Sequence, residues 1–161
     1  MTNKGTENAR GSKALDFIDA KNSNILEKIA EHHFLKDLIL ATSLKKERVS
    51  IVYPTIDSFG YDLIIERYKD FKLLNSVKVQ LKAVKGNTDN WDIHKSILEL
   101  KSGRIILIRF NKDEEPIYKL FDKKNVSRAI ERKSKSKKEH KCKIKESEFI
   151  DITTDLLKIF K

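Results

Sequence analysis

The segment RIILIRF, residues 104–110, constrains the fold more than any other part of this chain. Its apolar residues follow one another without alternating with polar ones. A strand with one face in water alternates apolar and polar residues, whereas a strand covered on both faces reads as a nearly continuous apolar run. We therefore expect residues 104–110 to form a central strand, with a layer of structure on each side of its sheet.

The segments around this strand carry helix and strand patterns. Apolar residues recur at helical spacing from Ile25 to Ile39, after Ser23 or Asn24 as a possible N-cap. Alternating segments then favour strands. The expected elements are a helix from residue 25 to about 42, strands at 48–53, 61–67 and 75–84, a short helix at 94–101 closed by Gly103, the central strand, and an edge strand at 117–121.

A length of 161 residues predicts one domain, which the sequence divides into three parts. Residues 1–22 are polar and expected to be disordered. Residues 23–121 form the expected core. Residues 122–161 add a basic arm, with eleven Lys or Arg against three Glu between 123 and 146, and a closing strand and helix at 149–160. We expect the arm to be a mobile loop.

Charge and cysteine content narrow the class of partner and the compartment. The net charge of +10 suits a polyanionic partner, nucleic acid first and an acidic membrane second, although a lysine-rich surface that only aids solubility is the plain alternative. No apolar run approaches the roughly 18 residues that would cross a bilayer. Of the two polyanions we expect nucleic acid as the partner, and no membrane. Cys142 is the only cysteine, which fits a reducing, cytoplasmic location.

Polar residues mark two of the expected strands. Asp62 precedes the apolar run of one, and Gln80 and Lys82 alternate with apolar residues in the next. If these strands pair, Asp62 faces Gln80 and Lys82. Carboxylate and amide oxygens suit Mg²⁺, and a lysine beside them suits phosphate chemistry. The alternative is that Asp62 is only a turn residue and that Gln80 and Lys82 form the solvent face of an amphipathic strand.

Three segments follow one another in the chain: a helix with Glu (AEHHFLKDLI), then GYDLIIE, then VQLKA. This order resembles the core of the PD-(D/E)XK nuclease superfamily. That superfamily includes restriction enzymes, Holliday-junction resolvases and some homing endonucleases. The resemblance covers residues 23–121. It implies an α/β (α+β) fold with a restriction-endonuclease-like αβββαβ core, a mixed central sheet flanked by helices. By this resemblance the metal-binding acid is Asp62, the (D/E)XK motif is Gln80-Leu81-Lys82, and the helical Glu is Glu31, with Glu27 as second choice.

The sequence departs from the family pattern at two positions. Tyr61 stands where the family has proline, which requires only compatibility with a strand. Gln80 replaces an acid, and its neutral oxygen holds a cation less tightly than a carboxylate. The resemblance still implies a DNA endonuclease that uses Mg²⁺, with Mn²⁺ as a possible substitute. Asp62, Gln80 and the Leu81 carbonyl would hold the metal, and Lys82 would position or activate water.

The expected partner is duplex or branched DNA, bound by a homodimer if both strands are cut. The candidate DNA contacts are Lys85 and Lys95 beside the site and Arg132, Lys133, Lys135, Lys137 and Lys138 in the arm. Two alternatives remain: an inactive nuclease-fold module that binds nucleic acid, and a protein-interaction domain whose basic arm binds an acidic partner.

Overall fold

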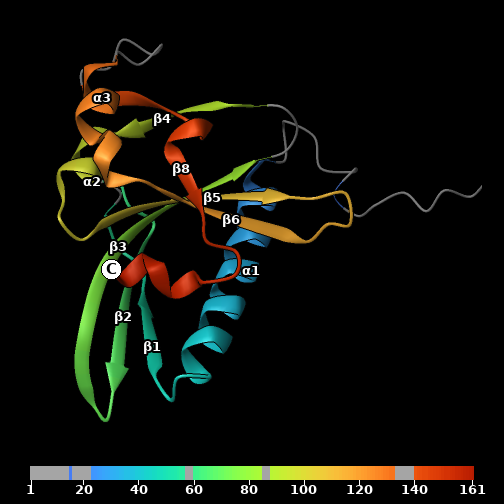
Figure 1. The fold of residues 1–161 in the computed structure, drawn as a ribbon, viewed down its shortest axis with the longest axis vertical. Coiled ribbons are helices and arrows are strands. Elements are labelled where there is room, and N and C mark those ends of the chain that lie inside the picture. Colours follow the sequence, from blue (N-terminus) through green and yellow to red (C-terminus); the bar gives the residue numbers. More distant parts are fainter. Residues whose placement is uncertain (1–14, 16–22, 57–59, 85–87, 133–139) are drawn as a thin grey trace, which may run out of the picture.

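A mixed six-stranded sheet with a long helix against one face forms the framework of the protein (Figure 1). The structure, a computed structural model, describes residues 15, 23–56, 60–84, 88–132 and 140–161, so the expected disorder of residues 1–22 falls almost entirely outside it. The strand order is β1-β2-β3-β5-β6-β8, and only β3 and β5 pair in parallel among these neighbours. The expectation of a mixed central sheet with helices is confirmed.

The elements follow the expected order, with strand β4 added inside the core and further elements after it. The helices are α1 (Ser23–Ser43), α2 (Lys95–Glu99) and α3 (Val126–Glu131), with 3-10 turns η3 (Lys123–Asn125), η4 (Glu146–Glu148) and η5 (Leu156–Phe160). The strands are β1 (Arg48–Val52), β2 (Leu63–Lys69), β3 (Lys72–Val84), β4 (Asn90–His94), β5 (Gly103–Phe110), β6 (Pro116–Phe121), β7 (Lys141–Lys145) and β8 (Phe149–Asp151).

Strand β5 lies inside the sheet and is covered on both faces, as its sequence predicts. Residues 105–108 are all buried. Ile106 and Ile108 pack in a core with α1, whereas Ile105 packs in a second core on the other side. The continuous apolar run is therefore explained by two separate cores that share one strand.

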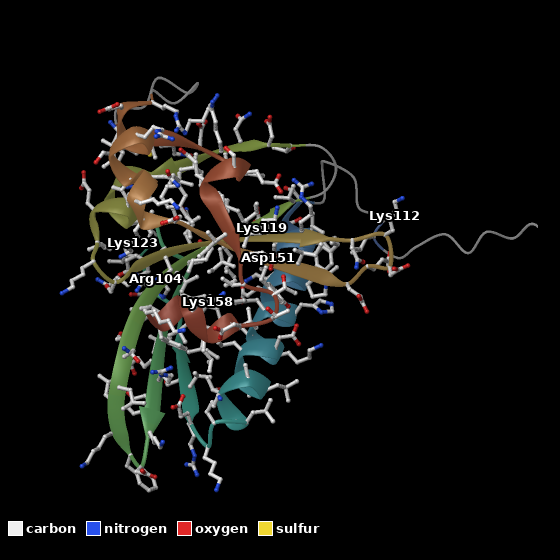
Figure 2. All side chains as sticks on the ribbon, in the orientation of Figure 1. Arg104, Lys112, Lys119, Lys123, Asp151 and Lys158 are labelled. Carbon is white, nitrogen blue, oxygen red and sulfur yellow. The ribbon has the colours of Figure 1, made fainter. Side chains whose placement is uncertain are left out.

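The core on the α1 side joins distant parts of the chain. Phe34 and Leu38 of α1 pack with the inward residues of β2 and β3 and with Ile159 and Phe160 of η5. Arg104 fastens this last segment, because its guanidinium donates to the carbonyl oxygens of Ile159 at 2.7 Å and Lys161 at 2.8 Å. Figure 2 shows Arg104 close to Lys158, on the same face as η5. Burial lowers the pKa of Arg104.

The second core lies under the two-stranded sheet formed by β4 and β7, with α2 and α3. Much of the segment expected to be a mobile basic arm is thus ordered as η3, α3 and β7, and only residues 133–139 of it lie outside the described ranges. Cys142 is buried here, and burial raises the pKa of its thiol to about 11. The thiol is therefore protonated at neutral pH and a poor nucleophile.

The structure corrects several boundaries. Strand β6 is not an edge, because β8 pairs with it through residues 149–151. Gly103 begins β5 instead of closing a helix, and a Cβ there would lie 2.0 Å from the carbonyl oxygen of Ile97. Strand β2 begins two residues later than expected, and β3 three residues earlier. None of the helices in the described ranges is long and apolar enough to cross a membrane.

Candidate active site

Asp62 lies at the point where β2 separates from β3. The last paired residues are Leu63 and Val79. Beyond them, the Asp62 amide donates to the Val79 carbonyl at 2.8 Å, and the Leu81 amide donates to Asp62 Oδ2 at 2.7 Å. The carboxylate therefore accepts a backbone bond where the strand ladder ends, which fixes its position although the residue is exposed.

Asp62 lines a cavity of about 310 Å³ that lies between α1, the end of β1 and the diverging strands β2 and β3. This cavity collects most of the residues predicted to act together. Its lining consists of Glu27, Lys28, Ala30, Glu31, Tyr53, Pro54, Tyr61, Asp62, Leu81, Lys82 and Ala83. The helix, the acid before β2 and the lysine of β3 thus meet in one place.

Glu31 is held firmly in this cavity, whereas Glu27 lines it as an exposed residue. Glu31 is 8% exposed and accepts hydrogen bonds from the Tyr53 hydroxyl at 2.8 Å and the Lys28 ammonium at 3.0 Å. The bond to Glu31, with some burial and the carboxylate charge, raises the pKa of Tyr53. Tyr53 and Lys28 are site residues that sequence reasoning did not assign, and neither has a local motif that would mark it.

Lys82 contributes a positive charge to the cavity. None of the ion pairs formed within 4.0 Å by described residues includes Lys82. Its ammonium therefore lines the cavity without a carboxylate partner in contact. A cation in this state is available to an anionic ligand, because no existing ion pair has to break first.

Gln80 occupies a different position from the rest of the expected set. It is 8% exposed, does not line the cavity, and sits opposite Ile105 in the parallel register of β3 and β5. Its Oε1 atom is buried without a hydrogen-bond partner. The structure therefore brings Asp62, Leu81, Lys82 and Glu31 together and leaves Gln80 behind them, with an unused acceptor oxygen.

The donor atoms can be compared with the needs of Mg²⁺. Within the described ranges, no group of three or more His, Cys, Asp or Glu could hold a metal ion. Mg²⁺ keeps several waters and takes as few as one or two carboxylates. The Leu81 carbonyl faces the Asp62 side of β3, because a strand residue directs its N–H and C=O to the same side. Asp62 and this carbonyl are donors that fit a largely hydrated Mg²⁺ ion, whereas Gln80 does not line the cavity.

Gly60 packs closely against strand β4 and so helps to position the backbone that leads to Asp62. Its φ of +71° favours glycine, and a Cβ there would lie 2.3 Å from the Cβ of His94. His94 contacts Ser96, with Nδ1 and Oγ 2.7 Å apart, and its ring centroid is 4.9 Å from that of His140. A side chain at position 60 would push against β4 and displace the backbone leading to Asp62.

The two described residues among those predicted to bind DNA, Lys95 and Arg132, do not line the cavity. Lys95 begins α2, and its amide donates to the His140 carbonyl at 2.8 Å. Arg132 forms an ion pair with the buried Glu148, which holds it against the second core. The other predicted contacts lie outside the described residues: Lys85, Lys133, Lys135, Lys137 and Lys138.

Comparison of the chain with protein-family models, with curated proteins and with solved structures finds no match. What indicates a function is therefore the geometry of the cavity and the resemblance carried by its residues.

Proposed function

We propose that the protein is a Mg²⁺-dependent DNA endonuclease with a restriction-endonuclease-like core. The observation that supports this proposal best is the meeting of Asp62, Leu81, Lys82 and Glu31 in one cavity. These residues come from a helix and two strands in the order typical of the PD-(D/E)XK superfamily. The net charge of +10 supports a polyanionic substrate.

Each residue has a role that follows from its position. Asp62 and the Leu81 carbonyl would hold the metal ion, which when bound neutralises charge on the scissile phosphate. The Lys82 ammonium binds the phosphate and stabilises the charge that develops during cleavage. Glu31 is fixed by Tyr53 and Lys28 and orders water at the helix side of the cavity. A homodimer would supply two such cavities for the two strands of a duplex.

The direct test is cleavage of supercoiled and linear DNA in Mg²⁺ or Mn²⁺. We expect the wild type to nick or cut, and Asp62→Ala and Lys82→Ala to lose at least about 100-fold in rate. Lys158→Ala is the matched control, because it also removes a lysine but one that does not line the cavity. Lys158 lies near Arg104 instead (Figure 2). If all three variants match the wild type, or if the wild type is inert, the catalytic proposal fails.

The buried, neutral Gln80 favours a second candidate function, a nuclease-fold module that binds nucleic acid without cutting it. A site with a single carboxylate in direct reach of the cation holds that cation weakly. This alternative predicts DNA binding that weakens with salt and is unaffected by Asp62→Ala. Binding measured in EDTA beside cleavage measured in Mg²⁺ separates the two functions.

A further inference from the structure

The turn between β2 and β3 combines features that are individually unfavourable. It consists of Asp70 and Phe71, with φ values of +48° and +62°. Two-residue hairpins of this kind favour Asn-Gly or Asp-Gly, because both central residues need positive φ. A phenylalanine in the second position is strained, and residues strained in this way cluster at active sites and ligand-binding sites.

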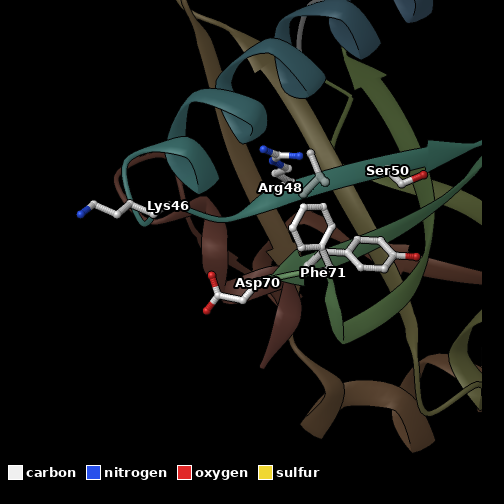
Figure 3. Close-up of a pocket in the computed structure, with 7 residues that line it drawn as sticks. Lys46, Arg48, Ser50, Asp70 and Phe71 are labelled. Atoms are coloured by element: carbon white, nitrogen blue, oxygen red, sulfur yellow. The ribbon is translucent and has the colours of Figure 1, made fainter.

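Phe71 is also 93% exposed, so its ring gains almost nothing from burial in the folded chain. The ring contacts the Arg48 side chain, whose guanidinium carbon lies 5.7 Å from the ring centroid (Figure 3). That contact leaves most of the ring surface open to a ligand.

The surroundings of the ring are basic. A hollow of about 450 Å³ beside it is lined by Lys46, Arg48, Val49, Ser50, Tyr68, Asp70 and Phe71. Lys69 and Lys72 flank the turn and are exposed. Two cations, Lys46 and Arg48, therefore line the hollow, and two more flank the turn, against Asp70 and the carboxylate of Glu66. The Glu66 carboxylate accepts a hydrogen bond from the Tyr68 hydroxyl at 2.6 Å. An aromatic platform among cations is how proteins bind unpaired nucleic-acid bases.

We propose that Phe71 stacks on an unpaired nucleobase, while Lys46, Arg48, Lys69 and Lys72 contact the adjoining phosphates. This inference depends on the nucleic-acid substrate of the proposed function and assigns part of its recognition. An apolar protein surface would also cover the ring, but the excess of positive charge around it favours a polyanion.

The turn at Asp70 and Phe71 is the tip of the β2–β3 hairpin. Its position sets a minimum size for a nucleic acid that contacts both this tip and the cavity. Strand β3 runs from Lys72 beside the tip to Lys82 in the cavity. Ten steps at about 3.3 Å give up to about 33 Å. At about 3.4 Å per base pair, this distance corresponds to about ten nucleotides of helical length. Lys78 lies on the same face of β3 as Lys82 and between the two ends, with its ammonium 5.3 Å from the Tyr61 ring centroid.

Phe71→Gly distinguishes a binding role from a structural one, because the two effects have opposite signs. The glycine relieves the strain of the turn and should raise Tm by about 2–4 °C. It should weaken binding of a fluorescein-labelled 16-nucleotide single strand, measured by anisotropy in EDTA, by about tenfold. Affinity for a blunt 16-base-pair duplex should change less than twofold, and a duplex with a single-stranded overhang should behave like the single strand.

Three further measurements sharpen the test. Phe71→Trp should keep the affinity, and its indole fluorescence should be quenched by the bound strand. The slope of log binding constant against log salt concentration should be unchanged in Phe71→Gly. In Arg48→Ala its magnitude should fall by about 0.7, because one phosphate contact is lost. Ile150→Ala, an exposed apolar residue on β8, is the control and should bind like the wild type.

Equal single-strand affinity of Phe71→Gly and wild type would overturn the inference. The inference would also be overturned if free Phe71→Gly sedimented differently from the free wild type while both bound single-stranded DNA equally. The tip would then be an interface between protein chains. If the wild type binds and cuts DNA while Phe71→Gly is indistinguishable from it, only this inference fails. If the wild type binds no nucleic acid, the proposed function fails with it.

Discussion

Two charged regions of the molecule differ in how completely their charges are paired. In the segment that leads to β8, Glu146 accepts from Arg109 and Lys119, both at 2.7 Å, and Glu148 accepts from Arg132 and from the Lys145 amide. Despite burial, these bonds lower the pKa of Glu146 and Glu148. In the cavity, by contrast, Lys82 forms none of the ion pairs among the described residues.

The difference separates charges that hold the fold from charges that serve a ligand. A buried carboxylate with two or three partners is fixed, and removing one partner leaves an uncompensated charge. A lysine that lines a cavity without a partner contributes little to folding and remains free to bind an anion. Substitutions in the two regions should therefore affect stability and activity in opposite proportions.

The largest expected effect on stability comes from Arg132→Met. This change leaves Glu148, which is only 5% exposed, without its ion-pair partner. We expect the free energy of unfolding, measured in urea, to fall by about 2–3 kcal/mol. Lys124→Met is the matched control, because it breaks an exposed pair with Asp122 and should cost less than about 0.5 kcal/mol. Equal losses in the two variants would contradict the comparison.

Gln80→Glu should change the metal dependence of the cavity. A carboxylate in place of the unpaired amide oxygen should tighten the apparent Mg²⁺ affinity by about tenfold, or about 1.4 kcal/mol. In EDTA the same variant should be less stable than the wild type, because its charge is buried without a partner. The readouts are a Mg²⁺ titration of cleavage and Tm with and without metal. Destabilisation without any change in Mg²⁺ dependence would show that Gln80 is remote from the cation.

The paired carboxylates predict a loss of stability in acid. The pKa of Glu146 is lower in the folded protein than its value of about 4.3 in an unfolded chain. Its stabilising contribution is therefore complete above that pH and is lost as the pH falls through the lower, folded pKa. The free energy of unfolding falls as the pH is lowered below about 4.5. In Glu146→Gln this fall should be smaller than in the wild type by about 0.5–1 kcal/mol. The same slope in both proteins would assign the acid sensitivity to other groups.

The smallest expected change in stability belongs to Lys82→Met, at less than about 0.5 kcal/mol. This variant should nevertheless lose DNA cleavage, because the cavity loses its unpaired cation. Urea denaturation and the cleavage assay are measured on the same preparation. A loss of stability as large as that of Arg132→Met would mean that Lys82 supports the fold and does not serve a ligand.

The sequence predicted those parts of the fold that depend on short-range patterns. The continuous apolar run of β5 and the alternation in β2 and β3 each follow from burial of one or both faces. The place of β6 was wrong because it depends on β8, three residues that pair from a distance in the chain. The basic segment was expected to be mobile because its lysines are visible in the sequence, whereas the contacts of Arg132 and Arg109 with Glu148 and Glu146 are not.

The candidate site shows the same division. Alternation placed Gln80 and Lys82 on one face of β3, and that remains the geometry. What alternation could not predict is the second core, which covers Gln80 at the position of Ile105 and leaves Lys82 at the cavity. The partners of Glu31 were also beyond reach, because Tyr53 approaches it from the end of another strand.

The packing of α1 against η5 has a consequence for synthesis of the protein. Phe34 and Leu38 are translated long before Ile159 and Phe160, which help to cover them. The nascent chain therefore exposes an apolar helix face until nearly all of these residues have left the ribosome. Chaperones that bind such surfaces would engage α1 during translation, and the packing of η5 against α1 would displace them.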